Sequence, residues 1–229
     1  YDFKKLKYFA GHSLGEYSAL ACAGSINFED TLKILQKRGK FMQEAVPSGE
    51  GAMLVVLGMA SKELDKILEM NNKKYECFIA NDNSNLQVVV SGLKKDINLL
   101  SDDLSNKKIK NLRLNVSAPF HCKYMKTASE KMTSFINDLN INELEKPIIS
   151  NVTANEISSP KEIKSLLISQ IEKKVRWLES VEYMINNGVK NFVEIGPGKV
   201  LSGLIKRINK NVNVRSINSV EDIKLLIND

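Results

Sequence analysis

The sequence predicts an α/β protein in which a parallel sheet covered by helices is interrupted by one smaller β-α-β-β-α-β unit. Short apolar runs alternate with helical patterns before residue 50 and after residue 118, as in a parallel sheet with helices on both faces. Over residues 51–117 the order of patterns becomes that of a ferredoxin-like unit. We therefore expect a large subdomain formed by residues 1–50 and 118–229, and a small subdomain formed by residues 51–117.

The composition is that of a folded globular protein, with 229 residues, 43% apolar and 26% charged. The three cysteines lack metal-ligand spacing, so we expect no metal site and a reducing compartment. No apolar run approaches the roughly 18 residues of a membrane span, so we expect a soluble protein. The net charge of +6 comes mainly from scattered lysines, which favours a solvated surface over nucleic-acid binding and leaves an acidic protein partner possible.

The large subdomain should open with a strand over residues 8–10 that leads directly into a helix over residues 14–23. A second helix should cover residues 28–44, because Glu29 and Asp30 would lie in its first turn, where a helix N-terminus favours negative charge. After residue 118, helices are expected over 123–139, 161–171, 176–187 and 200–208, and strands over 147–152, 192–195 and 213–217.

The small subdomain should contain four strands and two helices. Ser61 is placed as the N-cap of the first helix, with Leu64, Ile67 and Leu68 on one face. The strands are expected over 52–57, 77–80, 87–91 and 109–114, and the helices over 61–70 and 94–104.

One motif indicates nucleophilic catalysis. Residues 11–15 read Gly-His-Ser-Leu-Gly and lie between the first predicted strand and helix, which is the setting of a nucleophile elbow. The sharp turn would expose the hydroxyl of Ser13. The free N–H groups at the start of the helix, beginning with that of Leu14, would stabilise the oxyanion formed when Ser13 attacks a thioester carbonyl.

A serine hydroxyl needs a base within hydrogen-bonding distance, and the chain has two histidines. His12 is adjacent to Ser13, and alternation along the strand would point it away from the hydroxyl. His121 follows the segment where the small subdomain returns to the large one, a joint at which clefts commonly lie. We therefore expect His121 to be the base.

Four segments, in the same order and spacing, resemble the malonyl-coenzyme A:acyl carrier protein transacylase family. The resemblance covers nearly the whole chain and implies an α/β-hydrolase-like large subdomain with a ferredoxin-like small one. It also implies a ping-pong reaction in which malonyl passes from coenzyme A to Ser13, with His121 as base, and then to the phosphopantetheine thiol of acyl carrier protein. The coenzyme A thioester is then a substrate, and no cofactor is expected. The segments are residues 11–20 (GHSLGEYSAL), 38–43 (RGKFMQ), 119–122 (PFHC) and 194–201 (EIGPGKVL).

The resemblance also suggests substrate-binding residues. Gln170 would orient His121 through its backbone carbonyl. Arg38 would hold the free carboxylate of malonyl by two charge-assisted hydrogen bonds, so that acetyl groups would leave its charge unpaired. Met42, one turn later, would share its face of the helix. Phe120 resembles the malonyl-selective residue at this place, because its ring would crowd an α-methyl group.

Two further features follow from the resemblance. Residues 81–84 (Asn-Asp-Asn-Ser) resemble a loop that borders the family's cleft, with a plain polar turn as the alternative. In the family, a strand and a Gly-Gln-Gly turn precede the elbow and supply oxyanion contacts. The 229 residues contain no such turn, so we expect an incomplete oxyanion hole here and activity in the full-length protein.

Two other functions remain open at the level of sequence. In a serine esterase or thioesterase, water would replace the carrier thiol, although hydrolases of this type usually place the histidine near the C-terminus. A non-catalytic module would bind the carrier protein or coenzyme A without turnover. We expect a monomer in the cytoplasm or in the lumen of a plastid-like organelle.

Overall fold

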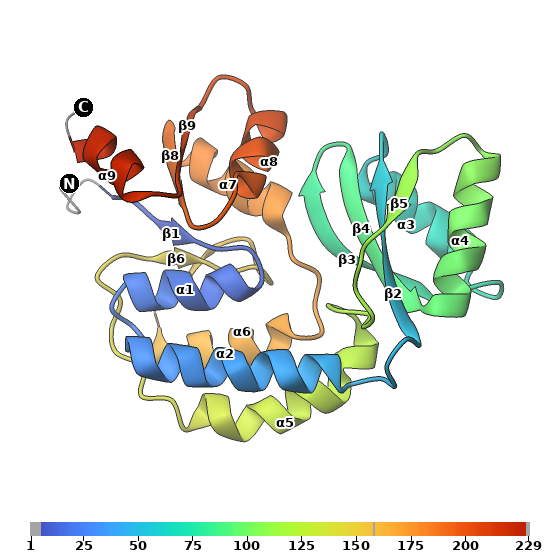
Figure 1. Ribbon diagram of the computed structural model, residues 1–229, viewed down its shortest axis with the longest axis horizontal. Coiled ribbons are helices and arrows are strands. Elements are labelled where there is room, and N and C mark those ends of the chain that lie inside the picture. The colour runs from blue at the N-terminus through green and yellow to red at the C-terminus, as the bar shows by residue number, and fades with distance from the viewer. Residues whose placement is uncertain (1–5, 158, 228–229) are drawn as a thin grey trace.

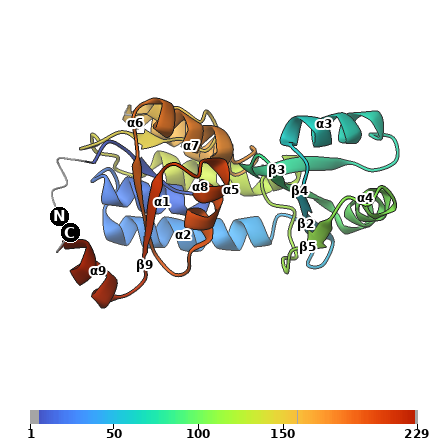
Figure 2. The same ribbon diagram turned by 90° about the horizontal axis from the view of Figure 1, so that it is seen from above.

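Two parts of the chain lie side by side along the long axis of the molecule (Figures 1 and 2). The computed structural model describes residues 6–157 and 159–227. One part carries the predicted elbow and most of the helices, and the other is built on a four-stranded antiparallel sheet. The mixed α/β class that the sequence predicts is confirmed.

The strands of the first part form two small sheets. β1 (Phe9–Ala10) pairs in parallel with β6 (Ile148–Ile149), and β6 pairs antiparallel with β7 (Glu156–Ile157). β8 (Asn191–Ile195) pairs in parallel with β9 (Asn213–Ile217). The prediction of one parallel sheet is therefore wrong in detail, because among the described residues these sheets are separate and β7 runs antiparallel.

Short strands explain why the sheet is divided. β1 and β6 have two residues each, because the chain turns away at Gly11 after β1 and at Ser150 after β6. In the part of the chain that the structure describes, the two sheets are joined by side-chain packing and not by backbone hydrogen bonds. Tyr8 and Ala10, at β1, belong to the same hydrophobic cluster as Phe192 of β8. The sequence shows the apolar runs but not how far each ladder extends.

Helices cover both faces of β6. Ile148 packs into the main core of the first part, whereas the next residue, Ile149, packs with Trp177 and Val181 on the opposite face. The helices of the main core are α1 (Leu14–Cys22), α2 (Phe28–Gln43), α5 (Lys126–Asn137) and α6 (Pro160–Gln170). The helices on the other face are α7 (Trp177–Asn186) and α8 (Val200–Ile208), and α9 (Val220–Ile227), which the sequence analysis did not predict, follows β9. The helix expected over residues 123–139 is divided into a 3₁₀ turn at Lys123–Met125 and α5.

The sequence of α2 brings a cation into the interior. The Asn27 side chain caps the helix by accepting the N–H of Asp30 at 2.8 Å. The buried residues of α2 follow helical spacing and include Ile34, Arg38 and Met42. Arg38 therefore lies on the face that packs beneath α1.

The second part has the predicted β-α-β-β-α-β order. Its strands pair antiparallel throughout, in the spatial order β3-β4-β2-β5. The elements are β2 (Gly51–Leu57), α3 (Ser61–Met70), β3 (Cys77–Ser84), β4 (Gln87–Leu93), α4 (Lys94–Asn106) and β5 (Asn111–Arg113).

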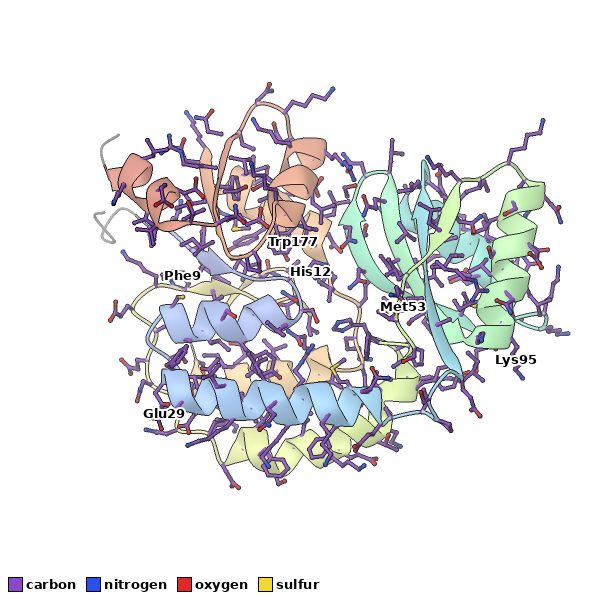
Figure 3. All side chains as sticks on the ribbon, in the orientation of Figure 1. Phe9, His12, Glu29, Met53, Lys95 and Trp177 are labelled. Carbon is purple, nitrogen blue, oxygen red and sulfur yellow. The ribbon has the colours of Figure 1, made fainter. Side chains whose placement is uncertain are left out.

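Alternation along β2 gives this sheet two buried faces. Leu54 and Val56 pack with α3 and α4 in the core of the second part. Met53, directly before Leu54 and on the other face, clusters with Val89 and with Phe120 of the first part. Figure 3 shows Met53 on the side of the sheet that faces the first part. The second part is therefore placed by contacts of its sheet as well as by the chain connections.

The two parts are also joined by backbone hydrogen bonds. The N–H of Val175 donates to the carbonyl of Ala80 at 2.8 Å, and the N–H of Asp82 donates to the carbonyl of Val175 at 2.9 Å. Pairing with β4 continues to Ser84, so β3 covers residues 81–84 and the prediction that they form a loop or polar turn is wrong. The polar residues of this strand stay buried because their backbone groups pair with the first part.

No helix in the described ranges, 6–157 and 159–227, combines the length and the apolar character needed to cross a membrane.

Two glycines of the predicted elbow make a matched pair for a stability test. A Cβ on Gly11 would lie 1.9 Å from the carbonyl oxygen of Gly15, whereas a Cβ on Gly15 would have no neighbour within 4 Å. Gly11→Ala should therefore lower the free energy of unfolding by about 1–3 kcal/mol, because backbone must shift. Gly15→Ala should leave it unchanged or raise it by up to about 1 kcal/mol. Urea unfolding of the two variants checks this, and equal effects would contradict the close approach at Gly11.

Candidate functional site

Ser13 lies at a strained turn between β1 and α1. Its backbone angles are φ 53° and ψ −106°, in a region that non-glycine residues rarely adopt. The side chain of Asn151 holds the turn from both sides, since Oδ1 accepts the N–H of Ser13 at 2.6 Å and Nδ2 donates to the carbonyl of Gly11 at 2.7 Å. The geometry is that of a nucleophile elbow, which projects the serine hydroxyl beyond the strand.

The hydroxyl of Ser13 has two partners from distant parts of the chain. Its oxygen lies 2.8 Å from Nε2 of His121 and accepts a hydrogen bond from Nη2 of Arg38 at 2.9 Å. The structure therefore brings together three residues that the sequence analysis selected. The Arg38 bond leaves the hydroxyl proton free to point toward His121.

The surroundings of His121 keep its imidazole neutral. The side chain is buried, and its Nδ1 lies 2.9 Å from the carbonyl oxygen of Gln170. Because a carbonyl only accepts, Nδ1 carries the proton and Nε2 presents a lone pair to Ser13. Burial, followed by the positive charge of Arg38, lowers the pKa of His121 to about 3. The residue is thus in the form that can take up a proton.

Arg38 is a buried cation with an unused donor. Its guanidinium lies 5.5 Å from the centre of the Tyr17 ring, and Nη2 also donates to Oε1 of Gln170 at 2.9 Å. Its Nε is buried and makes no hydrogen bond within the part of the chain that the structure describes. Burial lowers the pKa of Arg38, although an arginine remains charged in a protein.

Gln170 lies at the centre of a buried polar network. Its side-chain amide donates to the carbonyl oxygen of Ser13 at 2.9 Å and to Oε2 of Glu16 at 2.5 Å. Glu16 is 1% exposed, and both its oxygens also accept the backbone N–H of Asn151, at 3.4 Å. Burial raises the pKa of Glu16 to about 7, against the opposing effects of Gln170, Asn151 and Arg38.

The sequence analysis missed two residues of this network, Glu16 and Asn151. A signal for Glu16 was present, because Ser13 and Glu16 have the spacing of a helix capping box. The signal for Asn151 was a polar residue two positions after a buried strand, at the edge where the ends of parallel strands meet. The strand predicted over residues 147–152 included Asn151 and so concealed that signal.

The other predicted site residues lie in different surroundings. Leu14 is 54% exposed, and its N–H, the first of α1, has no hydrogen-bond partner among the described residues. Phe120 is half-buried and packs against both the main core and the inner face of the second sheet. Met42 is 2% exposed and belongs to the main core, one turn after Arg38 on the buried face of α2.

His12 faces away from the serine hydroxyl, as its place in the strand predicts. Its Nε2 lies 2.8 Å from Oδ1 of Asn83 in β3, and its ring lies 5.6 Å from that of Trp177 (Figure 3). Burial lowers the pKa of His12. The side chain thus connects the elbow to the second part.

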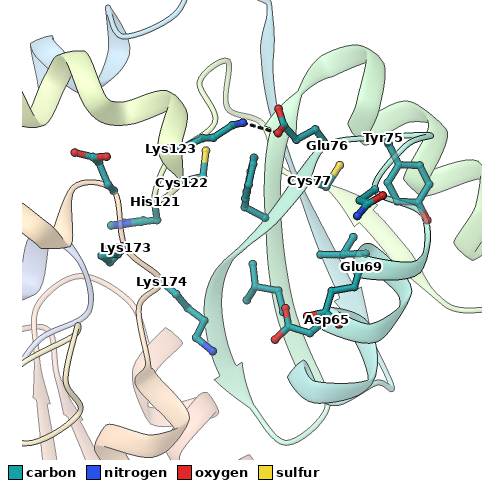
Figure 4. A pocket seen from close by; sticks show the side chains of 15 residues that line it. Asp65, Glu69, Tyr75, Glu76, Cys77, His121, Cys122, Lys123, Lys173 and Lys174 are labelled. Carbon is teal, nitrogen blue, oxygen red and sulfur yellow. Dashed lines mark hydrogen bonds and ion pairs between the residues drawn. The ribbon is translucent and has the colours of Figure 1, made fainter.

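An open pocket of about 560 Å³ lies between α3 and β3 on one side and the segments around residues 121–123 and 172–174 on the other. In Figure 4, His121 and Lys174 lie on one wall, opposite Asp65 and Glu69. Ser13 does not line this pocket, and His121 is the one residue of the polar network around Ser13 that does.

Over the described ranges, no group of three or more His, Cys, Asp or Glu side chains is arranged to hold a metal ion.

Comparison with known proteins shows the same fold and family. Residues 5–224 match the acyl transferase domain family. The chain is 43% identical over 223 residues to malonyl CoA-acyl carrier protein transacylase of Bacillus subtilis (strain 168), covering 95% of this chain and 69% of that protein. The crystal structure of acyl-carrier-protein-S-malonyltransferase from Bartonella henselae superposes with a TM-score of 0.94 at 40% identity, covering 98% of this chain and 72% of that one. A complex of a type II PKS acyl-carrier protein with its malonyl-transacylase also matches, with a TM-score of 0.92 at 37% identity over 97% of this chain and 73% of that one.

The mixed α/β fold and the domain match define the chain as an acyltransferase. The chain is 43% identical to two curated relatives, each covered over more than two thirds of its length, and both are malonyl CoA-acyl carrier protein transacylases. The chain belongs to the malonyl CoA-acyl carrier protein transacylase family.

The lowered pKa of His121 predicts how stability depends on pH. Between its ordinary value near 6.5 and the folded value of about 3, the unfolded chain binds a proton at His121 that the folded chain excludes. The free energy of unfolding should therefore fall at this site as pH falls through that window. His121→Asn removes the effect, and asparagine tolerates the positive φ of 59° at this position. Urea unfolding from about pH 7 to about pH 4 should show a shallower decline for the variant, and parallel curves would contradict a buried neutral imidazole.

Proposed function

We propose that this protein transfers malonyl from coenzyme A to the phosphopantetheine thiol of acyl carrier protein through a malonyl ester on Ser13. The observation that carries the proposal is the 2.8 Å contact between Ser13 Oγ and His121 Nε2, with Arg38 2.9 Å from the same oxygen. The relatives are malonyl CoA-acyl carrier protein transacylases, and their substrates are the ones we propose here.

In the first half-reaction, His121 acts as general base. Nε2 takes the hydroxyl proton while Ser13 Oγ attacks the thioester carbonyl carbon, and the carbonyl oxygen becomes an oxyanion. The unpartnered N–H of Leu14 at the start of α1 is a suitable donor for that oxyanion. The tetrahedral intermediate then collapses, the carbon–sulfur bond breaks, and the thiolate of coenzyme A receives the proton from His121.

The second half-reaction reverses these roles. His121 takes the proton of the carrier thiol, and the sulfur attacks the malonyl ester. The carbon–oxygen bond to Ser13 breaks, and His121 returns the proton to the serine oxygen. The carbonyl of Gln170 holds the Nδ1 proton throughout, so the tautomer needed in both halves is fixed. Proton and acyl group balance without a cofactor, so the coenzyme A thioester is only a substrate.

Arg38 is the proposed binding group for the malonyl carboxylate. A buried guanidinium with an unpartnered Nε offers a donor to a carboxylate beside Ser13. Phe120 is the proposed second filter, since its ring packs at the junction of the two parts beside His121 and would crowd an α-methyl group. Met42 is proposed to support the pocket by packing one turn beyond Arg38 on the same face.

We also propose the subdomain division that the sequence suggests. Residues 1–50 and 118–229 would form the α/β-hydrolase-like acyltransferase subdomain, and residues 51–117 the ferredoxin-like one. Separate hydrophobic clusters on α1, α2 and α5 and on β2–β4, α3 and α4 support the division. The β3-β4-β2-β5 order supports the ferredoxin-like description. The monomeric state and the location in the cytoplasm or a plastid-like organelle stay predictions.

Acylation of Ser13 tests the proposed function directly. Full-length protein incubated with malonyl-coenzyme A should gain the mass of one malonyl group, and Ser13→Ala should gain none, because the ester oxygen is removed. Intact-mass spectrometry measures both. Addition of holo acyl carrier protein should discharge the ester onto the carrier. Release of free malonate as fast as carrier acylation would indicate an esterase, and a wild type that never acquires the adduct would indicate a binding module.

The charge of Arg38 should determine acyl selectivity. Arg38→Met keeps an apolar chain of similar length but removes the partner of the malonyl carboxylate. The ratio of malonyl to acetyl transfer rates should fall by at least about thirtyfold, which corresponds to about 2 kcal/mol. Lys40→Met, an exposed change on the same helix, is the control and should keep the ratio. An unchanged ratio in Arg38→Met would remove Arg38 from the proposed pocket.

A further inference from the structure

The first turn of α1 contains a carboxylate that the proposed reaction does not use. Residues 13–16 have the sequence of a capping box, in which the Ser13 hydroxyl would accept the N–H of Glu16 and the Glu16 carboxylate would accept the N–H of Ser13. Neither side-chain bond forms. Asn151 takes the N–H of Ser13 instead, and the hydroxyl is engaged by other residues. The carboxylate of Glu16 therefore turns into the interior.

There, Glu16 meets the side-chain amide of Gln170. The amide uses both donor hydrogens on oxygens, Oε2 of Glu16 at 2.5 Å and the carbonyl of Ser13 at 2.9 Å, while its own oxygen accepts from Arg38 at 2.9 Å. A rotated amide would place Oε1 against two oxygens and its NH₂ group against a guanidinium. Since Gln170 is fully buried, water cannot compensate for those losses, and Glu16 acts with the Ser13 carbonyl and the Arg38 guanidinium to select one orientation.

That orientation places the guanidinium of Arg38. Nη2 makes bonds to Oε1 of Gln170 and to Oγ of Ser13, and the buried Nε makes none. If the Gln170 oxygen turned away, Arg38 would keep only the serine contact. The chain of contacts thus runs from the carboxyl group of Glu16, through a neutral amide, to the cation beside the nucleophile, and among the described residues no hydrogen bond or ion pair joins Glu16 to Arg38 directly.

We infer that Glu16 is a positioning residue, which fixes the side-chain amide of Gln170 and through it aligns Arg38 for the carboxylate of the acyl group. This inference rests on the proposed function. Glu16 touches neither substrate nor the reacting atoms, so its effect passes through Gln170.

A double-mutant cycle in the full-length protein tests this. The readout is the ratio of malonyl to acetyl loading rates on Ser13, measured by intact mass for wild type, Glu16→Gln, Gln170→Met and the double variant. Glu16→Gln should lower the ratio about tenfold, because the neutral amide no longer selects the orientation of Gln170. In the Gln170→Met background, where that amide is absent, the same change should alter the ratio by less than about twofold.

Asp96→Asn is the matched control, because Asp96 is a buried carboxylate on α4 in the second part. It should leave the ratio unchanged. If Glu16→Gln fails to fold by circular dichroism, Glu16→Asp takes its place in the cycle, since it keeps the charge but withdraws it by one methylene and should give a smaller loss that also disappears with Gln170→Met.

An unchanged ratio in the Glu16 variant, or an equal loss in both backgrounds, would overturn the inference while wild-type loading upholds the proposed function. A wild type that forms no malonyl ester would overturn both.

Discussion

The backbone of Ser13 imposes the constraint on which the site depends. A φ of 53° with a ψ of −106° is costly for a residue with a side chain, and this turn persists because Asn151 binds the peptide groups on both sides of it. Gly11 allows the close approach of the strand to α1 that the turn requires. With the turn in place, the hydroxyl projects to a point that α2 and the segment at residue 121 can both reach.

The base, His121, is oriented by a backbone carbonyl and not by a carboxylate. A carboxylate beside His121 would favour its protonated form, whereas the Gln170 carbonyl fixes the tautomer with no net charge. Burial and Arg38 then disfavour the imidazolium. The buried carboxyl group of Glu16, whose pKa burial raises to about 7, is separated from Arg38 by the Gln170 amide, which contacts both. The base therefore stays neutral beside a buried cation.

The sequence predicted the elements and motifs better than it predicted the contacts between them. The Gly-His-Ser-Leu-Gly run and the order of patterns over residues 51–117 depend on local spacing, and the structure has the corresponding elements. Asn151 and Glu16 act through partners more than a hundred residues away, and no local pattern specifies such a partner. The prediction of one parallel sheet failed for the same reason, since it depends on which edge another segment occupies. The prediction of a loop over residues 81–84 failed because these polar residues pair with β4 and, at Asn81, with Val175.

The pairing of Val175 with β3 has a mechanical consequence. Covalent connection joins the two parts near Gly51 and Pro119, which lie against each other. This covalent connection alone would let the second part rotate relative to the first. The backbone bonds at Val175 add a second anchor, and the packing of Met53 on Phe120 and the contact between His12 and Asn83 hold the second part at further points. Displacing the second part would break these contacts, so the wall that β3 contributes to the pocket beside His121 is held in place relative to the base.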